Sequence, residues 1–339
     1  MFEQQNPPFF YILIPAFNVE DYILTCLESI DTQSYRNFEC HIINDGSEDK
    51  TLECIKGFIQ SKKNFFVYNQ SNKGISLTRN QLLKKVGKGY VVWIDPDDYI
   101  DVNYLETCSF LISRYQPDIL LFDFFYKKKK EYRHVLPFNE GFVGFDIILK
   151  ELAFDWQFPS QLWNKVYRSD LFENINFSNK LTILEDFALQ VSLFKKGQKF
   201  YYASQSFYHY VQHEASALSK KNKQKEISQL KIRRERVEEI LRIDRSLFNV
   251  CLLSWLISYY YSLSLTFTIV DSREDRQTYT QLLEKELEKI EKISKTYKIS
   301  FLNKVLLLGC TFMRTPLIIF LPKLKKFSRV IKKTIAKFR

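Results

Sequence analysis

Runs of β-branched and aromatic residues alternate with segments of helical periodicity over residues 9–98, and this alternation restricts the fold more than any other feature. Between the apolar runs, VEDYILTCLESIDTQ and GISLTRNQLLKKV carry apolar residues at helical spacing, and a further helix is expected from about Asp49. Strands that alternate with helices need right-handed crossovers and a mainly parallel sheet covered on both faces. The sequence therefore predicts an α/β fold whose first strands are FFYILIP, FECHIIND, FFVYNQ and YVVWIDPDD.

Polar clusters follow three of these strands, at the point where each strand ends. They are Pro15–Asn18, Asn44–Ser47 and Asp95–Asp98. In open α/β sheets, ligands bind outside the carboxyl ends of the strands, where the strand order reverses. We therefore expect the three clusters to meet at one rim of the sheet and to form one site.

The aspartates Asp95, Asp97 and Asp98 place three like charges at the end of a buried strand. A turn followed by a helix cap explains one carboxylate at such a position. Two or three carboxylates directed at one point form an oxygen site for a hard divalent cation, which usually keeps positions open for substrate phosphates. This pattern predicts a hard divalent cation as the cofactor.

Two further motifs each allow a structural and a functional interpretation. NDGS is typical of a turn that enters a helix, but Asp45 at a strand end is also suited to accept the imide N–H of a pyrimidine base. In NKGISLTRN, Gly74 stands at a helix start, where backbone donors favour anions. Arg79 lies one turn further, either as a surface residue or as a phosphate contact.

In order and spacing, four motifs closely resemble the signature of family 2 glycosyltransferases. They are PAFN (15–18), NDGS (44–47), NKG with Arg79-Asn80 (72–80) and DPDD (95–98). The resemblance is specific over residues 1–100 and continues more weakly to about Ser219. It implies the Rossmann-like glycosyltransferase A fold, an inverting transfer from a nucleotide-sugar, and a place in the assembly of bacterial surface polysaccharides.

The roles of the family's motif residues carry over to the matching positions of this chain. Pro96 replaces the small residue that is common in the family, a mild departure. The resemblance implies that Pro15, Phe17 and Asn18 line the nucleotide pocket, that Asp45 reads uracil and hence UDP, that Gly74 and Arg79 lie near the diphosphate or sugar, that Asp95 contacts the ribose and donor sugar, and that Asp97, helped by Asp98, holds Mg²⁺ or Mn²⁺ on the diphosphate.

The segment ILEDFALQVSLF carries an acidic pair, Glu185 and Asp186. Acidic residues at a helix start complement the helix dipole by about 0.3–1 kcal/mol each, which explains the pair without any chemistry. The family, however, places its general base in such a pair. By this resemblance Asp186 takes the proton of the acceptor hydroxyl, with Glu185 as its neighbour, and one displacement inverts the sugar carbon without an enzyme nucleophile.

The acceptor half is less patterned. DILLFDFFY predicts a strand, KKKKE a solvated hairpin tip, and both QLWNKVYRSDLF and EDFALQVSLFKKG predict helices. Trp163 is a candidate to stack on a sugar and Lys165 to contact phosphate, although an aromatic in such a segment is more often part of the core. His209 or His213 is a candidate contact for metal or diphosphate. Val211 stands where relatives often carry arginine.

Composition changes after about residue 220. Residues 246–270 carry no charge and are long enough to span a bilayer, but three central tyrosines favour a buried helix. In the tail, apolar residues at helical spacing alternate with basic ones, which predicts binding to an anionic membrane surface. The expected divisions are a catalytic domain at 1–219, with a nucleotide-binding half at 1–100 and an acceptor half at 101–219, a helical extension at 220–300 and a membrane-associating tail at 301–339.

The net charge of +11 favours an anionic partner. A nucleic-acid binder is excluded because it needs basic and aromatic residues interleaved on one face, whereas the excess charge here lies in the tail. PAFN is not the glycine-rich loop of a sugar nucleotidyltransferase. The six cysteines lack paired spacing and the first residues lack a secretory pattern, so we expect a location at the inner face of the cell membrane.

We therefore predict a metal-dependent hexosyltransferase acting on a glycan or lipid-linked acceptor. The alternative is an inactive membrane-bound scaffold or nucleotide-sugar-binding homologue.

Overall fold

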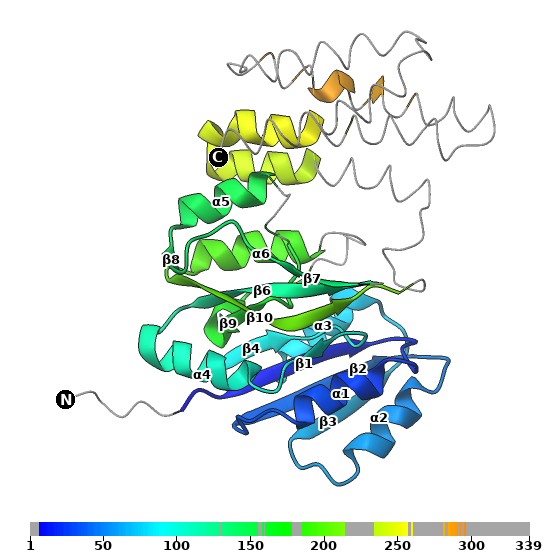
Figure 1. Cartoon of the computed structure of the whole chain (residues 1–339). Helices are drawn as coiled ribbons and strands as arrows, with labels where there is room; N and C mark the ends of the chain where they lie inside the picture. The colour runs from blue at the N-terminus through cyan, green and yellow to red at the C-terminus, as the bar shows by residue number, and fades with distance from the viewer. Residues whose placement is uncertain are drawn as a thin grey trace. The chain divides into compact units, whose positions relative to one another are not determined.

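The computed structural model of the chain describes residues 7–128, 130–154, 160–177, 185–213 and 234–256, with a few isolated positions between 158 and 295. The chain divides into two compact units, Met1–Lys220 and Lys221–Arg339. In the first unit, which Figure 1 shows in blue to green, strands and helices alternate along the chain. Its elements are β1 (Phe10–Ala16), α1 (Ile23–Asp31), β2 (Phe38–Asp45), α2 (Thr51–Ile59), β3 (Phe65–Gln70), α3 (Ile75–Leu83), β4 (Tyr90–Trp93), β5 (Tyr99–Ile100), α4 (Tyr104–Tyr115), β6 (Ile119–Lys127), β7 (Glu131–His134), β8 (Gly141–Val143), α5 (Phe145–Phe154), β9 (Lys165–Arg168), the 3₁₀ helix η1 (Ser169–Phe172), α6 (Glu185–Lys196) and β10 (Phe200–Val211).

The four predicted N-terminal strands form a parallel block in the order β3-β2-β1-β4. Their order reverses beside β1, which pairs with β2 on one side and with β4 on the other. The carboxyl ends of β1, β2 and β4 therefore lie at the same edge, as the sequence predicts. This parallel block and its crossover helices confirm the α/β prediction.

The sheet continues through the second half of the unit as β9-β6-β10-β5, with β7 paired to β6 and β8 paired to β10, so that it has ten strands among the described residues. Strand β9 runs antiparallel to both β4 and β6, whereas β10 is parallel to β6. The prediction of a helix over QLWNKVYRSDLF is wrong: residues 165–168 form β9 and residues 169–172 a 3₁₀ turn. A run this short satisfies either period, and pairing on both sides decides for the strand.

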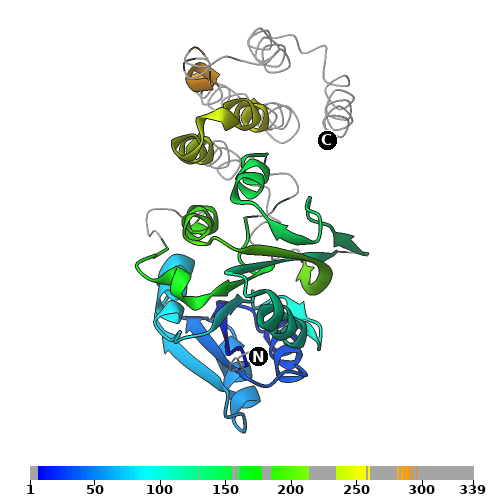
Figure 2. The ribbon, with the colours of Figure 1, turned by 90° about the vertical axis from the view of Figure 1, so that its left-hand side faces the viewer.

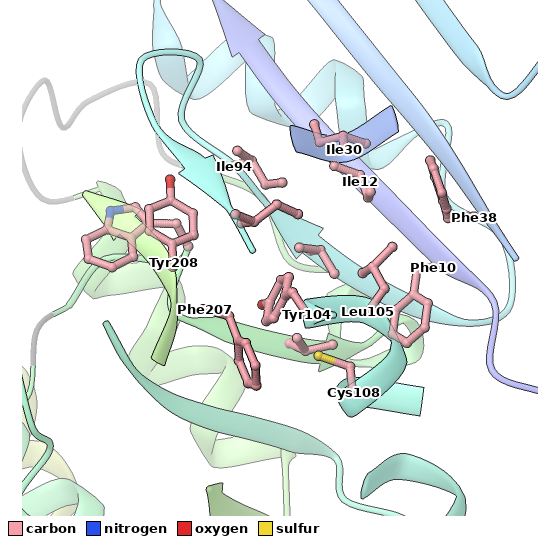
Figure 3. Close-up of a cluster of buried hydrophobic side chains, with 14 of the residues drawn as sticks. Phe10, Ile12, Ile30, Phe38, Ile94, Tyr104, Leu105, Cys108, Phe207 and Tyr208 are labelled. Atoms are coloured by element: carbon pink, nitrogen blue, oxygen red, sulfur yellow. The ribbon is translucent and has the colours of Figure 1, made fainter. Parts of the chain in front are cut away.

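The core lies between the sheet and the helices α1 and α4 (Figure 3). Phe10 and Ile12 alternate along β1 toward this face, where Cys26 and Ile30 of α1 and Tyr104 of α4 are all at most 1% exposed. The opposite face carries α3 and α6, which Figure 2 shows on the other side of the sheet from α1. The five described cysteines are free and four of them are buried.

In the second unit, residues 234–243 and 248–256 are helical and are joined by the 3₁₀ turn η2 (Arg245–Leu247). Cys251, Leu252, Trp255 and Leu256 are at most 1% exposed, so one side of the described part of the uncharged run is buried, whereas Ser246 at its start is exposed. Within the described ranges, no helix combines the length and the apolarity needed to cross a bilayer. Most of residues 257–270 and all of the tail 301–339 lie outside the described residues, and the expected domain boundaries stay predictions.

Candidate active site

The loops after β1 and β2 are held together by a short chain of hydrogen bonds. The backbone N–H of Asn18 donates to Ser47 Oγ (3.0 Å), while Asn18 Oδ1 accepts from the backbone N–H of Glu48 (2.9 Å). Ser47 Oγ in turn donates to Asn44 Oδ1 (2.6 Å). Pro15 is buried at the end of β1, whereas the ring of Phe17 is 43% exposed. An exposed aromatic ring on a braced loop is suited to contact a flat ligand.

The side chain of Asp45 holds the loop between β3 and α3 by hydrogen bonds. Its Oδ1 accepts from Gln70 Nε2 (2.7 Å) and from the backbone N–H of Lys73 (2.8 Å), and its Oδ2 accepts from the backbone N–H of Gly74 (2.9 Å). Gly46 allows this closure, because it has a φ of 72° and a Cβ there would lie 2.6 Å from the backbone nitrogen of Asn72. The carboxylate of Asp45 therefore positions the entrance to α3.

The DPDD turn is held from beneath by Tyr208 on β10. The backbone N–H of Asp95 donates to the Tyr208 hydroxyl (3.0 Å), which donates to Asp98 Oδ2 (2.7 Å). Asp98 Oδ1 accepts from the backbone N–H of Val211 (2.7 Å), and Asp98 is 1% exposed. Burial, together with Asp95 and Asp97, raises the pKa of Asp98 well above its usual range. The structure thus places Asp98 in the interior and ties the turn to β10.

Asp97 lies at the open side of the same turn. Its Oδ2 is 2.8 Å from His213 Nε2, and the side chain of Asp97 is 24% exposed. The His213 ring stacks on Tyr22, with 4.2 Å between the ring centroids. Carboxylate oxygens suit Mg²⁺ or Mn²⁺, whereas imidazole suits Zn, Cu, Fe and Ni, so Asp97 rather than His213 is the donor for the expected cation. Because no group of three or more His, Cys, Asp or Glu is poised to hold a metal among the described residues, a cation here needs oxygens from a ligand as well.

Arg79 joins the donor half of the site to the acceptor half. Its guanidinium forms an ion pair with Asp186 Oδ1 at the start of α6, and its Nη2 lies 3.8 Å from Asp95 Oδ1. The guanidinium also lies over the rings of Trp93 (5.9 Å) and Phe177 (5.4 Å). Arg79 is 6% exposed, which excludes the surface interpretation left open by the sequence. One buried cation therefore brings together two of the candidate acids.

The acceptor-side candidates lie mainly in the protein interior. Trp163 is 3% exposed, and its ring stacks on Tyr208 (4.5 Å) and Tyr210 (5.4 Å). Lys165 is fully buried and donates to Gln161 O (2.7 Å) and Asn164 Oδ1 (2.6 Å).

Burial lowers the pKa of Lys165, while Asp186 acts in the opposite direction. The ring of His209 stacks on Tyr99 (4.3 Å). Its Nε2 lies 2.9 Å from Asp101 Oδ1, and its Nδ1 lies 2.9 Å from Glu131 Oε1. Glu185 is the first residue of α6.

Tyr208 is the functional residue that our reading of the sequence missed. The alternation in FYHYV places Tyr208 and Tyr210 on one face of a strand, which identifies both as inward-facing. The contact of Tyr208 with the DPDD turn, 113 residues away in the case of Asp95, depends on the antiparallel pairing of β5 with β10. No local pattern records that pairing.

Carboxylates that follow parallel strands, beside a reversal of the strand order, lie where open α/β sheets bind their ligands. Residues 11–175 match the family described as Glycosyl transferase family 2, and this part of the chain belongs to that family. The fold is that of the crystal structure of S. aureus TarS 1–349 in complex with UDP-GlcNAc. The two share a TM-score of 0.67 and 19% identity over 98% of this chain and 92% of that chain.

Two curated bacterial relatives each match about three fifths of the chain. Glycosyltransferase GlyA of Streptococcus pneumoniae serotype 4 is 32% identical over 209 residues, which make up 59% of this chain and 30% of GlyA. The minor teichoic acid biosynthesis protein GgaB of Bacillus subtilis is 27% identical over 206 residues, 59% of this chain and 23% of GgaB. The chain thus spans less than a third of the length of either relative.

Proposed function

We propose that this protein is an inverting glycosyltransferase that moves a sugar from a nucleotide-sugar, most simply a UDP-sugar, to a hydroxyl of a glycan or lipid-linked acceptor in the synthesis of a cell-surface polysaccharide. The observation that carries this proposal is the bridge of Asp95 and Asp186 through Arg79. Through this bridge, the loops at the ends of the nucleotide-binding strands are linked to the start of α6, where Asp186 stands. A site for the donor and a base for the acceptor then face each other.

The donor is held by the loops at the strand ends. Phe17 and Pro15 contact the base, Asn18 keeps their loop in place, and Asp45 has the position to accept the imide N–H of uracil while it holds Lys73 and Gly74. The backbone N–H groups at the start of α3 favour the diphosphate. The UDP-GlcNAc complex of TarS, which has the same fold, agrees with a UDP-sugar donor.

Asp186 acts as the general base. The adjacent guanidinium of Arg79 favours the ionised carboxylate, which a base requires before it takes a proton. The hydroxyl of the acceptor loses its proton to Asp186 and attacks the anomeric carbon, and the bond to the nucleoside diphosphate breaks on the opposite side. One displacement of this kind inverts the configuration of the sugar carbon.

Mg²⁺ or Mn²⁺ would be held by Asp97, with His213 beside it and Asp95 at the donor side. When bound, the cation neutralises charge that develops on the departing diphosphate. Asp98 supports the turn from the interior rather than facing the ligand. Trp163 and Lys165 shape the acceptor side from beneath, and His209 braces β5.

The relatives favour a surface polymer as the product, since one of them is named for minor teichoic acid biosynthesis. Such synthesis takes place at a membrane, and the basic amphipathic tail at 301–339 is suited to hold the enzyme at the anionic inner leaflet. These residues lie outside the described part of the structure, so the proposal for the tail depends on the sequence pattern alone.

The test is UDP binding and UDP-sugar hydrolysis by the full chain, with and without Mn²⁺, for wild type, Asp97→Asn and Asp186→Asn. We expect Asp97→Asn to abolish the metal-dependent part of UDP binding. Asp186→Asn is expected to bind UDP normally and to lose UDP-sugar hydrolysis, in which water takes the place of the acceptor hydroxyl, by a factor on the order of 10³, as removal of a general base does. Glu185→Gln, a matched acidic neighbour on α6, is expected to change hydrolysis by less than about tenfold.

A catalytically inactive nucleotide-sugar-binding homologue is the alternative. It predicts UDP binding that depends on Asp97 together with no turnover of any UDP-sugar. A folded protein that binds no nucleotide under any metal condition contradicts both versions and leaves a membrane scaffold.

A further inference from the structure

The hairpin between β6 and β7 carries a block of lysines that the catalytic site does not use. Lys127 ends β6, Glu131 begins β7, and the two residues pair across the hairpin. Lys127, Lys128 and Lys130 are exposed, and residues 127–130 are all lysine. A concentrated positive charge at a hairpin tip is unfavourable unless solvent, or an anionic partner, screens it.

The strand directions place this hairpin at the rim of the active site. β9 is antiparallel to both β4 and β6, so β6 runs in the direction of β4 and of β1. The carboxyl end of β6, at Lys127, therefore lies at the same edge of the sheet as the ends of β1, β2 and β4. Strand β10 ends at this edge too, because it is parallel to β6.

Hydrogen bonds connect the hairpin directly to the candidate active site. Lys127 Nζ donates to the hydroxyl of Tyr99 (3.0 Å), which directly follows Asp98 in the chain, and the ammonium lies over the same ring. The backbone N–H of Gln212 donates to Lys127 O (2.8 Å), and Gln212 directly precedes His213, the partner of Asp97. The basic tip is thus fixed a few residues from the proposed metal site.

The hairpin is also braced on its second strand. His209 lies between Glu131 of β7 and Asp101, with 2.9 Å to each carboxylate, and its ring stacks on Tyr99 and Phe125. The Tyr126 hydroxyl donates to Gln212 Oε1 (2.5 Å). These contacts hold the backbone of the hairpin in place beside the site, so an anion that binds the lysines loses little to ordering of that backbone.

We propose that Lys127, Lys128 and Lys130 form a binding surface for the phosphate groups of an anionic acceptor chain, which enters the active site along this rim. The inference depends on the proposed transferase function, since it assigns the class of acceptor for the same site. An acceptor that reacts through one hydroxyl must run out of the site over neighbouring surface. Phosphodiester groups along that chain match three exposed ammonium groups, whereas a neutral glycan gains nothing from them.

The exposed lysines favour a polymer over a bilayer as the occupant. Residues that anchor a protein in a membrane combine basic side chains with apolar ones that enter the lipid. At the described positions of the tip, 127, 128 and 130, the side chains are all lysine. Tyr132 on β7 and Val135 just after it are each 55% exposed, but the ring of Tyr132 stacks on Tyr126 (5.0 Å). At the tip itself, charge therefore outweighs exposed apolar surface.

The experiment measures binding of a fluorescent poly(glycerol phosphate) oligomer to the full chain by anisotropy, at salt concentrations from about 50 to 200 mM. The test variant is Lys128→Gln with Lys130→Gln. The matched control is Lys84→Gln with Lys88→Gln, two exposed lysines that follow α3 and precede the amino end of β4. UDP binding is measured in parallel with every variant.

We expect the hairpin variant to bind the oligomer about tenfold more weakly and to lose part of the salt dependence, while the control changes by less than about twofold. Equal affinity in wild type and hairpin variant, or an equal loss in the control, overturns the proposal. Loss of binding to anionic phosphatidylglycerol vesicles with unchanged oligomer binding also overturns it in favour of a bilayer. Absence of UDP binding in the wild type counts against the transferase function instead.

Discussion

Arg79 and Asp186, 107 residues apart in the chain, form a part-buried ion pair that links α3 to α6. The pair lies between the nucleotide-binding strands and the helix that carries the proposed base. Arg79 is held in place by Trp93 and Phe177 as well as by charge. The bridge therefore joins the two halves of the site through protein side chains.

Removing either member of this pair should destabilise the domain and couple to removal of the other. We expect Arg79→Ala to lower the free energy of unfolding by about 2 kcal/mol, because it leaves Asp186 with a largely desolvated charge. A double-mutant cycle with Asp186→Ala, measured by urea unfolding, should give a coupling energy of at least about 1 kcal/mol. The exposed pair Arg36–Asp31, at 3.8 Å, is the control and should give less than about 0.5 kcal/mol. Additive effects of Arg79→Ala and Asp186→Ala would show that the bridge is incidental.

Tyr208→Phe should weaken the turn that presents Asp97. The variant removes the hydroxyl that bonds both the backbone of Asp95 and the carboxylate of Asp98, and we expect a loss of about 1–3 kcal/mol on urea unfolding. Metal-dependent UDP binding should weaken at the same time. Tyr210→Phe is the matched control, because Tyr210 stacks on the same Trp163. Equal stability of the two variants would contradict the role given to the Tyr208 hydroxyl.

Gly46→Ala should strain the loop that carries Asp45. The φ of 72° disfavours any other residue, and the added Cβ would lie 2.6 Å from the backbone nitrogen of Asn72. We expect a loss of about 1–3 kcal/mol in stability and weaker UDP binding. Gly57→Ala serves as the control: Gly57 lies within α2 and a Cβ there has no neighbour within 4 Å. That change should stabilise the protein by about 0.5–1 kcal/mol, and the prediction fails if both substitutions have the same sign.

His41 should make stability depend on pH in mildly acidic solution. Burial lowers its pKa from the usual value of 6.5, opposed by Glu39 and helped by Lys85. Below pH 6.5 the unfolded chain therefore binds a proton that the folded protein accepts less readily, so stability falls as the pH drops toward the folded pKa and is regained above 6.5.

His41→Phe keeps the stacking position between Tyr11 and Phe66 but removes this titration. The stability of wild type relative to His41→Phe, measured by urea unfolding between about pH 5 and 8, should rise with pH by at most about 1.4 kcal/mol per unit. A constant difference across that range would exclude the effect.

Periodicity and motif spacing in the first hundred residues were sufficient to predict the parallel strands, the shared rim and the family. These features are local, since a strand's apolar run, the polar residues at its end and the glycine of a loop are contiguous in the chain. The same method failed at residues 161–172, because a short segment such as KVYR fits a helix or a strand until its pairing partners are known.

The sequence by itself determined which residue types stand at the strand ends, and hence the class of chemistry that the rim supports. Only the tertiary structure decided which carboxylate faces outward and which faces inward. Asp97 and Asp98 are adjacent and chemically identical, yet Asp97 lies beside His213 and Asp98 is buried under Tyr208. It likewise decided that Arg79 bridges two acids and that the lysine hairpin borders the site. Each of these contacts joins segments distant in the chain, whose meeting depends on strand order rather than on any local pattern.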